Sequence, residues 1–279
     1  MNRYRRSRVG RKLIARLGYR LVRPGTIAQD VTVGNGFRMT LRLDAYLDRA
    51  IYFDAFEHTT CEVLSSLLRP NDTFIDVGAN IGFFSLMAAR LVGVGGRVVA
   101  FEPNRTACAR LRLACQLNGC DDIVVVREYG LANRQGTVPL FVPNEGDEGL
   151  ASLRHPGNGI GYSEQRIGLR RLDDEWSIGT PLRVLKVDVE GSELEVLRGA
   201  QGLLTRERPH VVCEFNEETA RRFGYHPVEI VRFLLDGIGG YQLNLLTSRE
   251  IVHDVAPGSW REHLPKLENL WFAPRRARL

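Results

Sequence analysis

The segment at residues 73–91 constrains the fold of this chain more than any other. Five residues of strand type (TFIDV) lead into a turn that contains Gly78 and Gly82, and a helical run begins directly after it at Phe83. Glycines at a strand-to-helix turn let the backbone approach a ligand closely and present amide groups at a helix N-terminus. The segment therefore predicts one βα unit of an open α/β sheet, with a ligand bound at the turn.

The alternation of strand-like and helix-like segments continues along the chain. Apolar strands are predicted at residues 97–101, 123–126, 184–189, 211–215, 241–246 and 269–272. Helices are predicted at residues 57–68, 106–117, 192–204 and 227–235. Strands that alternate with helices at this spacing form a parallel sheet covered on both faces. We therefore expect a doubly wound α/β fold whose mostly parallel, seven-stranded sheet has an antiparallel last strand. Residues 136–142 also resemble a strand, and a loop is expected to follow them.

Residues 1–56 are predicted to be an N-terminal extension, and residues 57–279 the α/β domain. The extension contains a basic helix over residues 8–23, with arginines around an apolar stripe, and a β-hairpin over residues 30–43. Such a helix either contacts an anionic membrane surface or packs on the domain, and we favour packing. The first 25 residues carry eight Arg, one Lys and no acidic residue, so they account for the net charge of +5. The rest of the chain gives no sign of nucleic-acid binding.

Cysteine usage and the apolar pattern indicate the compartment. The five cysteines are odd in number and lack Cys-x-x-Cys spacing, which is typical of free thiols in a reducing environment. No apolar run is long enough to span a membrane, and the basic N-terminus is not followed by the apolar core of a secretory signal. We therefore expect a cytoplasmic protein.

Two carboxylates identify the kind of ligand expected at the glycine turn. Glu102 ends the second strand, where a carboxylate can accept both hydroxyls of a ribose, and Asp76 ends the first strand. An acid at this position would repel a pyrophosphate, and the turn is D-x-G-x-N-x-G, whereas dinucleotide-binding proteins have G-x-G-x-x-G. A cationic sulfonium with an amino-acid tail tolerates the acid. The turn therefore favours S-adenosylmethionine over a nicotinamide dinucleotide.

A second charged cluster follows the fourth strand. Strand alternation directs Lys186, Asp188 and Glu190 to one face at the ligand-binding edge, where Glu214 could join them. The cluster suggests an acceptor site, although an ion pair that fixes the loop is an alternative. We expect Asp188 to be the general base and Glu190 to orient acceptor hydroxyls. Lys186 either keeps Asp188 ionised or acts as the base itself, if burial lowers its pKa.

No metal is expected in this site. The chain has no cluster of His and Cys with the spacing of metal ligands. Asp188, Glu190 and Glu214 could in principle hold a hard cation through oxygen.

Ordered motifs across roughly residues 45–235 resemble the FkbM family of methyltransferases. The motifs are LLRPNDTFIDVGANIGFFSL, VVAFEPN, GLANRQGTVPLFV, RRLDDEW, LKVDVEGSELEVLRGAQGLL and PHVVCEFN, in this order. The resemblance implies a Rossmann-like class I methyltransferase fold and S-adenosylmethionine as the methyl donor. It also implies O-methylation of a hydroxyl on a small molecule or glycan, in secondary-metabolite, sugar or glycolipid tailoring.

The resemblance also implies two groups of site residues. Those that would border the cofactor are Glu57, Asp76, Gly78, Asn80, Gly82 and Glu102. Those that would border the transferred methyl are Asp188 and Glu190. The sequence departs from the family pattern at Asn71, where Gly is usual, and at Asn133, where Asp is common. An acid with a role beside the adenine is therefore not expected at position 133.

Three other functions remain alternatives to a small-molecule or glycan O-methyltransferase. A nucleic-acid methyltransferase would suit the Arg-rich N-terminus, but the sequence shows no aromatic and basic platform for stacking bases. A nicotinamide-dependent oxidoreductase lacks the expected turn, and a non-enzymatic binding module would leave both carboxylate clusters without a role. The loop of residues 143–166 and the N-terminal region are expected to shape the acceptor pocket. Their residues do not indicate whether the acceptor is a sugar, a lipid or a polyketide.

Overall fold

The computed structural model describes residues 26–33, 36–144, 150–155, 157, 159, 161–176, 181–256 and 267–275. The helix predicted over residues 8–23 lies outside these residues, so its packing or membrane contact stays a prediction. None of the described helices is long and apolar enough to cross a membrane.

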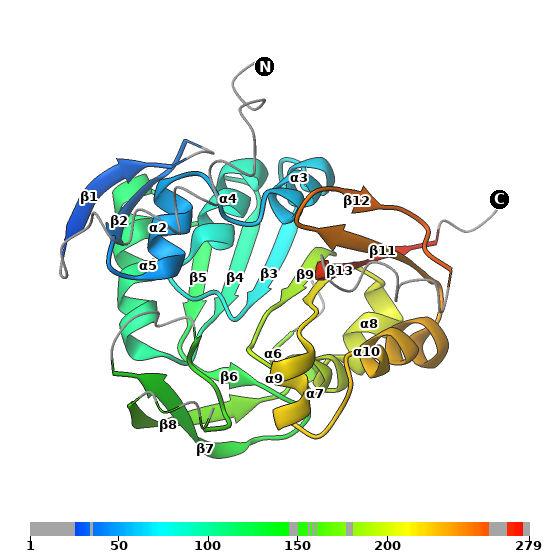
Figure 1. Cartoon of the computed structure of the whole chain (residues 1–279). Coiled ribbons are helices and arrows are strands. Elements are labelled where there is room, and N and C mark those ends of the chain that lie inside the picture. The colour runs from blue at the N-terminus through cyan, green and yellow to red at the C-terminus, as the bar shows by residue number, and fades with distance from the viewer. Residues whose placement is uncertain are drawn as a thin grey trace.

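A central sheet of eight strands organises the fold, in the order β12-β11-β13-β10-β9-β3-β4-β5 (Figure 1). Its strands are β3 (Thr73–Val77), β4 (Arg97–Phe101), β5 (Val124–Arg127), β9 (Leu182–Val187), β10 (His210–Glu214), β11 (Tyr241–Thr247), β12 (Ile251–Val252) and β13 (Leu267–Pro274). The strands β5, β4, β3, β9 and β10 pair in parallel, whereas β13 runs antiparallel to both β10 and β11. The mostly parallel sheet with an antiparallel last strand is therefore confirmed. The prediction of seven strands is short by β12, which adds two residues at the edge of the sheet.

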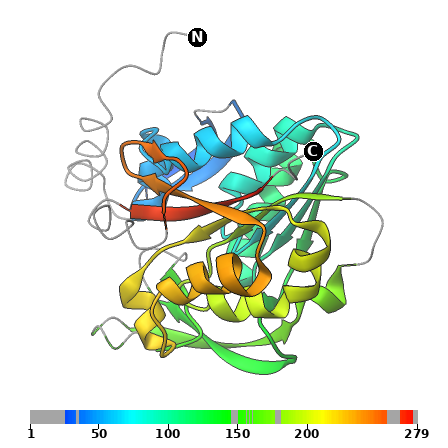
Figure 2. The same cartoon turned by 90° about the vertical axis from the view of Figure 1, so that its right-hand side faces the viewer.

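Helices cover both faces of this sheet (Figures 1 and 2). One face packs on α3 (His58–Leu67), α4 (Phe83–Val92) and α5 (Arg105–Asn118), and the other on α7 (Glu193–Gly199), α8 (Gln201–Glu207), α10 (Val228–Arg232) and the π-helix η2 (Phe233–Ile238). Because side chains alternate along a strand, Phe74 belongs to the first core cluster and its neighbour Ile75 to the second. Two short helices remain, α6 (Leu172–Glu175) and α9 (Glu217–Arg222).

The predicted N-terminal hairpin is confirmed as β1 (Ile27–Thr32) and β2 (Arg38–Arg42), which pair antiparallel. Met39 and Leu41 of β2 are buried in the same core cluster as the helices α4 and α5. The helix α2 (Tyr46–Tyr52) follows the hairpin, and the sequence pattern did not predict it. These elements therefore pack on the same face of the sheet as α4 and α5.

A separate three-stranded sheet lies beyond the carboxyl ends of β3, β4 and β9 (Figure 1). It consists of β6 (Gly130–Leu131), β8 (Tyr162–Arg170) and β7 (Gly136–Pro143), in this order. The prediction of a strand at residues 136–142 is confirmed, but the loop expected over residues 143–166 extends too far, because β8 begins at Tyr162. Only Ile167 and Leu169 of β8 are buried, so its apolar pattern is too short to identify a strand.

Candidate active site

The carboxyl ends of the strands open on a cavity of ≈ 870 Å³. Most of the residues predicted for the site line this cavity, namely Glu57, Gly78, Asn80, Glu102, Lys186, Asp188 and Glu190. Asp76 and Gly82 do not line it but lie directly behind its wall, where they support lining residues. Strands separated by more than 100 residues of chain thus bring the two predicted clusters into one space.

The glycine turn is shaped by its contact with β9. Gly78 has φ +79°, and a Cβ atom on it would lie 1.7 Å from the carbonyl oxygen of Asp188. The N–H of Asp188 donates to the carbonyl of Val77 at 3.0 Å, which holds the two strand ends together. Gly82 has φ +91°, and a Cβ there would meet Leu111 of α5 at 2.1 Å. Both glycines are therefore needed for close packing, and Gly78 also for the left-handed turn at the cavity.

Glu102 is held rigidly at the end of β4. Its Oε2 accepts the N–H of Asn80 at 2.8 Å, and its Oε1 accepts the N–H of Asn104 at 2.8 Å. A carboxylate has about four lone-pair sites, so two remain for further donors such as the hydroxyls of a ribose. Burial raises the pKa of Glu102 to about 7. The geometry leaves room for the hydroxyls of a ribose, and the role of Glu102 in holding them stays a prediction.

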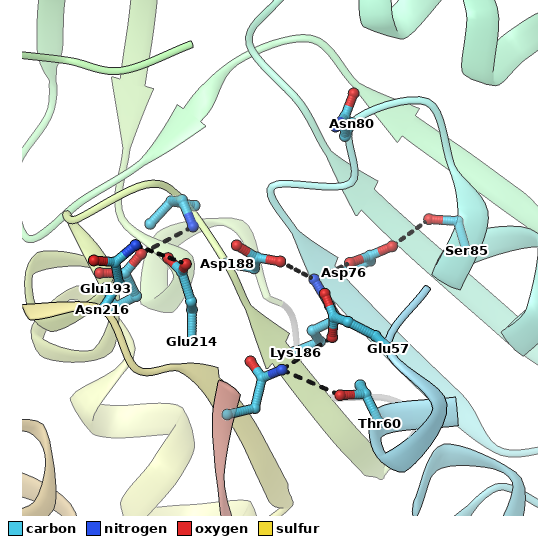
Figure 3. Close-up of polar contacts among 12 residues, drawn as sticks. Glu57, Thr60, Asp76, Asn80, Ser85, Lys186, Asp188, Glu193, Glu214 and Asn216 are labelled. Carbon is cyan, nitrogen blue, oxygen red and sulfur yellow. Dashed lines mark hydrogen bonds and ion pairs between the residues drawn. The ribbon is translucent and has the colours of Figure 1, made fainter. Parts of the chain in front are cut away.

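Lys186 is the centre of a buried charge network (Figure 3). Its Nζ lies 2.9 Å from Oδ2 of Asp188, 3.8 Å from Oδ1 of Asp76 and 4.8 Å from the ring centre of Phe84. Asp76 also accepts a hydrogen bond from the hydroxyl of Ser85 at 2.7 Å. The network therefore ties the end of β9 to the strand and helix that flank the glycine turn.

The protonation of Lys186 decides between its two predicted roles. Burial alone would lower the pKa of this amine, but the carboxylates of Asp188, Asp76 and Glu57 outweigh burial and raise it. The alternative in which a lowered pKa makes Lys186 the base is therefore wrong. A charged Lys186 that pairs with Asp188 agrees with the geometry.

Glu57 is the N-cap residue of α3, and its side chain lies next to Lys186 (Figure 3). Its backbone is left-handed, with φ 33°, and its Oε2 accepts the Nδ2 of Asn269 at 2.9 Å. The same Nδ2 lies 3.1 Å from the hydroxyl of Thr60. Burial, followed by the negative charge of Asp188, raises the pKa of Glu57 to about 7. Asn269 comes from the last strand, and no sequence signal identified it.

The loop after β9 is fixed by Glu193, which sequence reasoning missed. Oε1 of Glu193 accepts the N–H groups of Val189 and Gly191 at 3.0 and 2.9 Å, and its Oε2 accepts the hydroxyl of Tyr225 at 3.0 Å. Glu190, between them, has φ 57° and lines the cavity. An acidic residue in the first turn of a helix is common, so Glu193 gave no signal of this function.

Glu214 joins the cluster at the end of β10, as expected. Val212 pairs with Lys186 and Cys213 with Val187, so Glu214 lies level with Asp188. Oε1 of Glu214 accepts the Nδ2 of Asn216 at 3.4 Å, and among the described residues its Oε2 has no hydrogen-bond partner. Burial, together with Asp188 and Glu190, raises the pKa of Glu214 well above its ordinary value.

Acidic side chains outnumber basic ones along the cavity wall. Of the described residues that line it, the basic one is Lys186, and the acidic ones are Glu57, Glu102, Asp188, Glu190, Glu214, Glu217, Glu218 and Glu268. No group of His, Cys, Asp and Glu among the described residues is arranged to hold a metal ion. Such a wall suits a ligand that is cationic or rich in hydrogen-bond donors.

A protein-family model described as a methyltransferase FkbM domain matches residues 76–243, more than half of the chain. The methyltransferase sdnD of Sordaria araneosa is 32% identical over 161 residues, which are 47% of this chain and 61% of that protein. The AMB antimetabolite synthetase AmbE of Pseudomonas aeruginosa is 29% identical over 187 residues, which are 54% of this chain and 9% of that protein. The chain therefore spans less than two thirds of the length of either relative.

A solved structure, that of methyltransferase FkbM from Methylobacillus flagellatus KT, aligns with a TM-score of 0.48 and 19% identity. The alignment covers 81% of this chain and 54% of that one. The family match includes the glycine turn, Glu102 and the Lys186–Asp188 pair, which the structure brings to one cavity. The chain belongs to the FkbM family of methyltransferases, which have the class I fold and use S-adenosylmethionine as cofactor.

Proposed function

We propose that this protein transfers a methyl group from S-adenosylmethionine to a hydroxyl oxygen of a small molecule or glycan. The observation that carries the proposal is the shared cavity, in which the glycine turn and Glu102 lie beside Asp188 and Glu214. A site for a nucleoside-bearing donor and a carboxylate suited to an acceptor hydroxyl therefore adjoin each other. Holding two reactants in this way supplies a large part of the barrier reduction in a displacement reaction.

The cofactor end of the cavity is formed by the glycine turn. Glu102 would accept the ribose hydroxyls, while Gly78 and Asn80 would border the rest of the donor. Asn80 adds a further polar group, because among the described residues its Oδ1 is buried without a hydrogen-bond partner. The donor supplies an electrophilic methyl group, and the acid-rich wall tolerates its positive charge. This fit rests on side chains that are already positioned by backbone amides.

Asp188 is the group we propose to take the acceptor's proton. When the acceptor oxygen displaces the thioether S-adenosylhomocysteine from the methyl carbon, the carbon–sulfur bond would break as the oxygen–carbon bond forms, and Asp188 would take the hydroxyl proton. A base in this position commonly contributes ~10²–10⁴-fold in rate. Lys186 orients this carboxylate through the 2.9 Å contact. Glu190 and Glu214 are placed to orient further hydroxyls of the acceptor.

The charge of the cavity disfavours the nucleic-acid alternative. A phosphate backbone is recognised mainly through Lys and Arg, whereas the described wall is predominantly acidic. A neutral hydroxyl compound avoids this repulsion. The acidic wall therefore supports an acceptor that is not a nucleic acid.

A thermal-shift screen tests the cofactor assignment. S-adenosylmethionine and S-adenosylhomocysteine are expected to raise the melting temperature, while NAD and a short RNA leave it unchanged. A response to NAD or RNA, without one to the methionine compounds, would contradict the proposal.

Variants at position 188 test the catalytic assignment. With a donor labelled in its methyl group and a panel of hydroxyl compounds, Asp188→Asn is expected to lose at least about 100-fold in turnover. Its affinity for S-adenosylhomocysteine should stay near that of the wild type. Near-normal turnover in this variant would show that the cluster is structural and that positioning alone drives the reaction.

A further inference from the structure

Two exposed apolar side chains lie at the cavity. Tyr46 of α2 is 50% exposed, Leu150 after β7 is 47% exposed, and both line the cavity. Tyr52 on the same helix and Leu113 on α5 are similarly exposed, at 41% and 46%, but neither lines the cavity. Large apolar side chains that remain in water beside a pocket are typical of ligand contacts.

Further apolar residues continue this surface into the cavity. Leu47 of α2 and Leu153 are partly buried and line the same wall. Leu47 packs against the core cluster beneath the hairpin, and Leu153 against the core of the small sheet. We call Tyr46, Leu47, Leu150 and Leu153 the apolar rim. The apolar rim is therefore held in place by two separate hydrophobic clusters.

The rim and the strand ends give the cavity two chemically different parts. Asp188 and Glu214 provide carboxylates at the strand ends, whereas the rim offers apolar carbon contacts. A small polar sugar would use only the carboxylates and leave the rim in water. A molecule that fills both parts must itself be polar at one end and apolar at the other.

We propose that the methyl acceptor is amphipathic, with its hydroxyl at Asp188 and an attached alkyl or acyl chain against the apolar rim. The inference rests on the proposed function, because it takes this cavity as the acceptor site. Each methylene group removed from water multiplies the affinity about fourfold. A chain that covers even part of the rim should therefore dominate binding.

Two series of alkyl compounds test the chain. Dissociation constants are measured by calorimetry with S-adenosylhomocysteine present, for methyl, hexyl and octyl β-D-glucoside and for butanol, hexanol and octanol, all below the concentrations at which they aggregate. We expect the dissociation constant to fall at least about tenfold from the shortest to the longest member of a series.

Matched variants test the rim. Leu150→Ser and Tyr46→Ser are each expected to weaken binding of the longest compound by about three- to tenfold. Leu113→Ser and Tyr52→Ser remove side chains of similar exposure outside the cavity and should leave it unchanged. All four side chains are about half exposed, so these substitutions leave the fold intact.

The outcomes separate this inference from the proposed function. Equal affinity along both series, including no binding of any member, overturns the amphipathic acceptor. Chain-length dependence that survives unchanged in both rim variants overturns the rim. Because cofactor binding is measured independently in the same samples, its loss would instead contradict the proposed function.

Discussion

Replacing Lys186 by Met removes the positive charge of the buried network but keeps most of its apolar stem. Lys186 is 2% exposed and Asp76 is 1% exposed, so Asp76 would be left in the interior without a counter-charge. The least costly response is to protonate this carboxyl. For a group with an ordinary pKa of about 3.9, protonation at pH 7 costs about 4 kcal/mol, at 1.36 kcal/mol for each pKa unit. This value is an upper bound on the effect of the substitution, because burial raises the pKa of Asp76 even beside Lys186. This value agrees with the roughly 3–5 kcal/mol lost when one partner of a buried ion pair is removed.

The same reasoning fixes how the effect depends on pH. At pH 5 the protonation of Asp76 costs only about 1.5 kcal/mol, so the destabilisation of Lys186→Met should shrink as the pH falls. Adding Asp76→Asn to Lys186→Met should recover part of the loss, because the variant then has no buried carboxylate at that position. Free energies of unfolding from urea denaturation at pH 5 and pH 7 measure each of these values.

An exposed ion pair provides the control. Arg221 lies 3.1 Å from Glu217 with its side chain 71% exposed, so Arg221→Met is expected to cost less than about 1 kcal/mol. A loss below about 1 kcal/mol for Lys186→Met at pH 7, with no change at pH 5, would refute the view that Lys186 neutralises Asp76.

Three further predictions concern the cofactor, the glycine turn and metal ions. Glu102→Gln should weaken binding of S-adenosylhomocysteine by about 1–3 kcal/mol at pH 8 in calorimetry. In the wild type, a pKa of about 7 means that affinity should fall about fivefold from pH 7 to pH 6, as the carboxylate takes up its proton, whereas Glu102→Gln should not show this fall. Unchanged affinity in the variant would remove Glu102 from the site. Gly78→Ala should lower the melting temperature and the cofactor affinity far more than Gly224→Ala. Both glycines have a positive φ, but only at Gly78 would the new Cβ atom lie against backbone atoms. Equal effects of the two substitutions would show that only the backbone strain of a positive φ matters. Activity should survive EDTA, and its loss with recovery in magnesium would establish a metal requirement.

The sequence by itself determined the fold and the chemical type of the cofactor site. Apolar strands that alternate with helices leave few ways to bury both faces, so the parallel sheet followed from the pattern of residues. Asp76 is next to the last residue of β3 and Glu102 follows β4, and parallel strands end at the same edge, so both residues had to lie at that edge of the sheet. Local signals of this kind are readable because a strand end, a turn and a helix start occupy only a few consecutive residues.

Only the tertiary structure decided how distant residues complete the site. Asn269 reaches Glu57 across 212 positions, and Glu193 fixes the loop at Glu190 through backbone amides, which no spacing in the sequence reveals. The direction of the pKa change at Lys186 likewise depends on three carboxylates, which come from a strand, from the residue after another strand and from the start of a helix. Burial and opposing charges compete at each such group, and the balance is set by distances in space, which the order of residues along the chain does not determine.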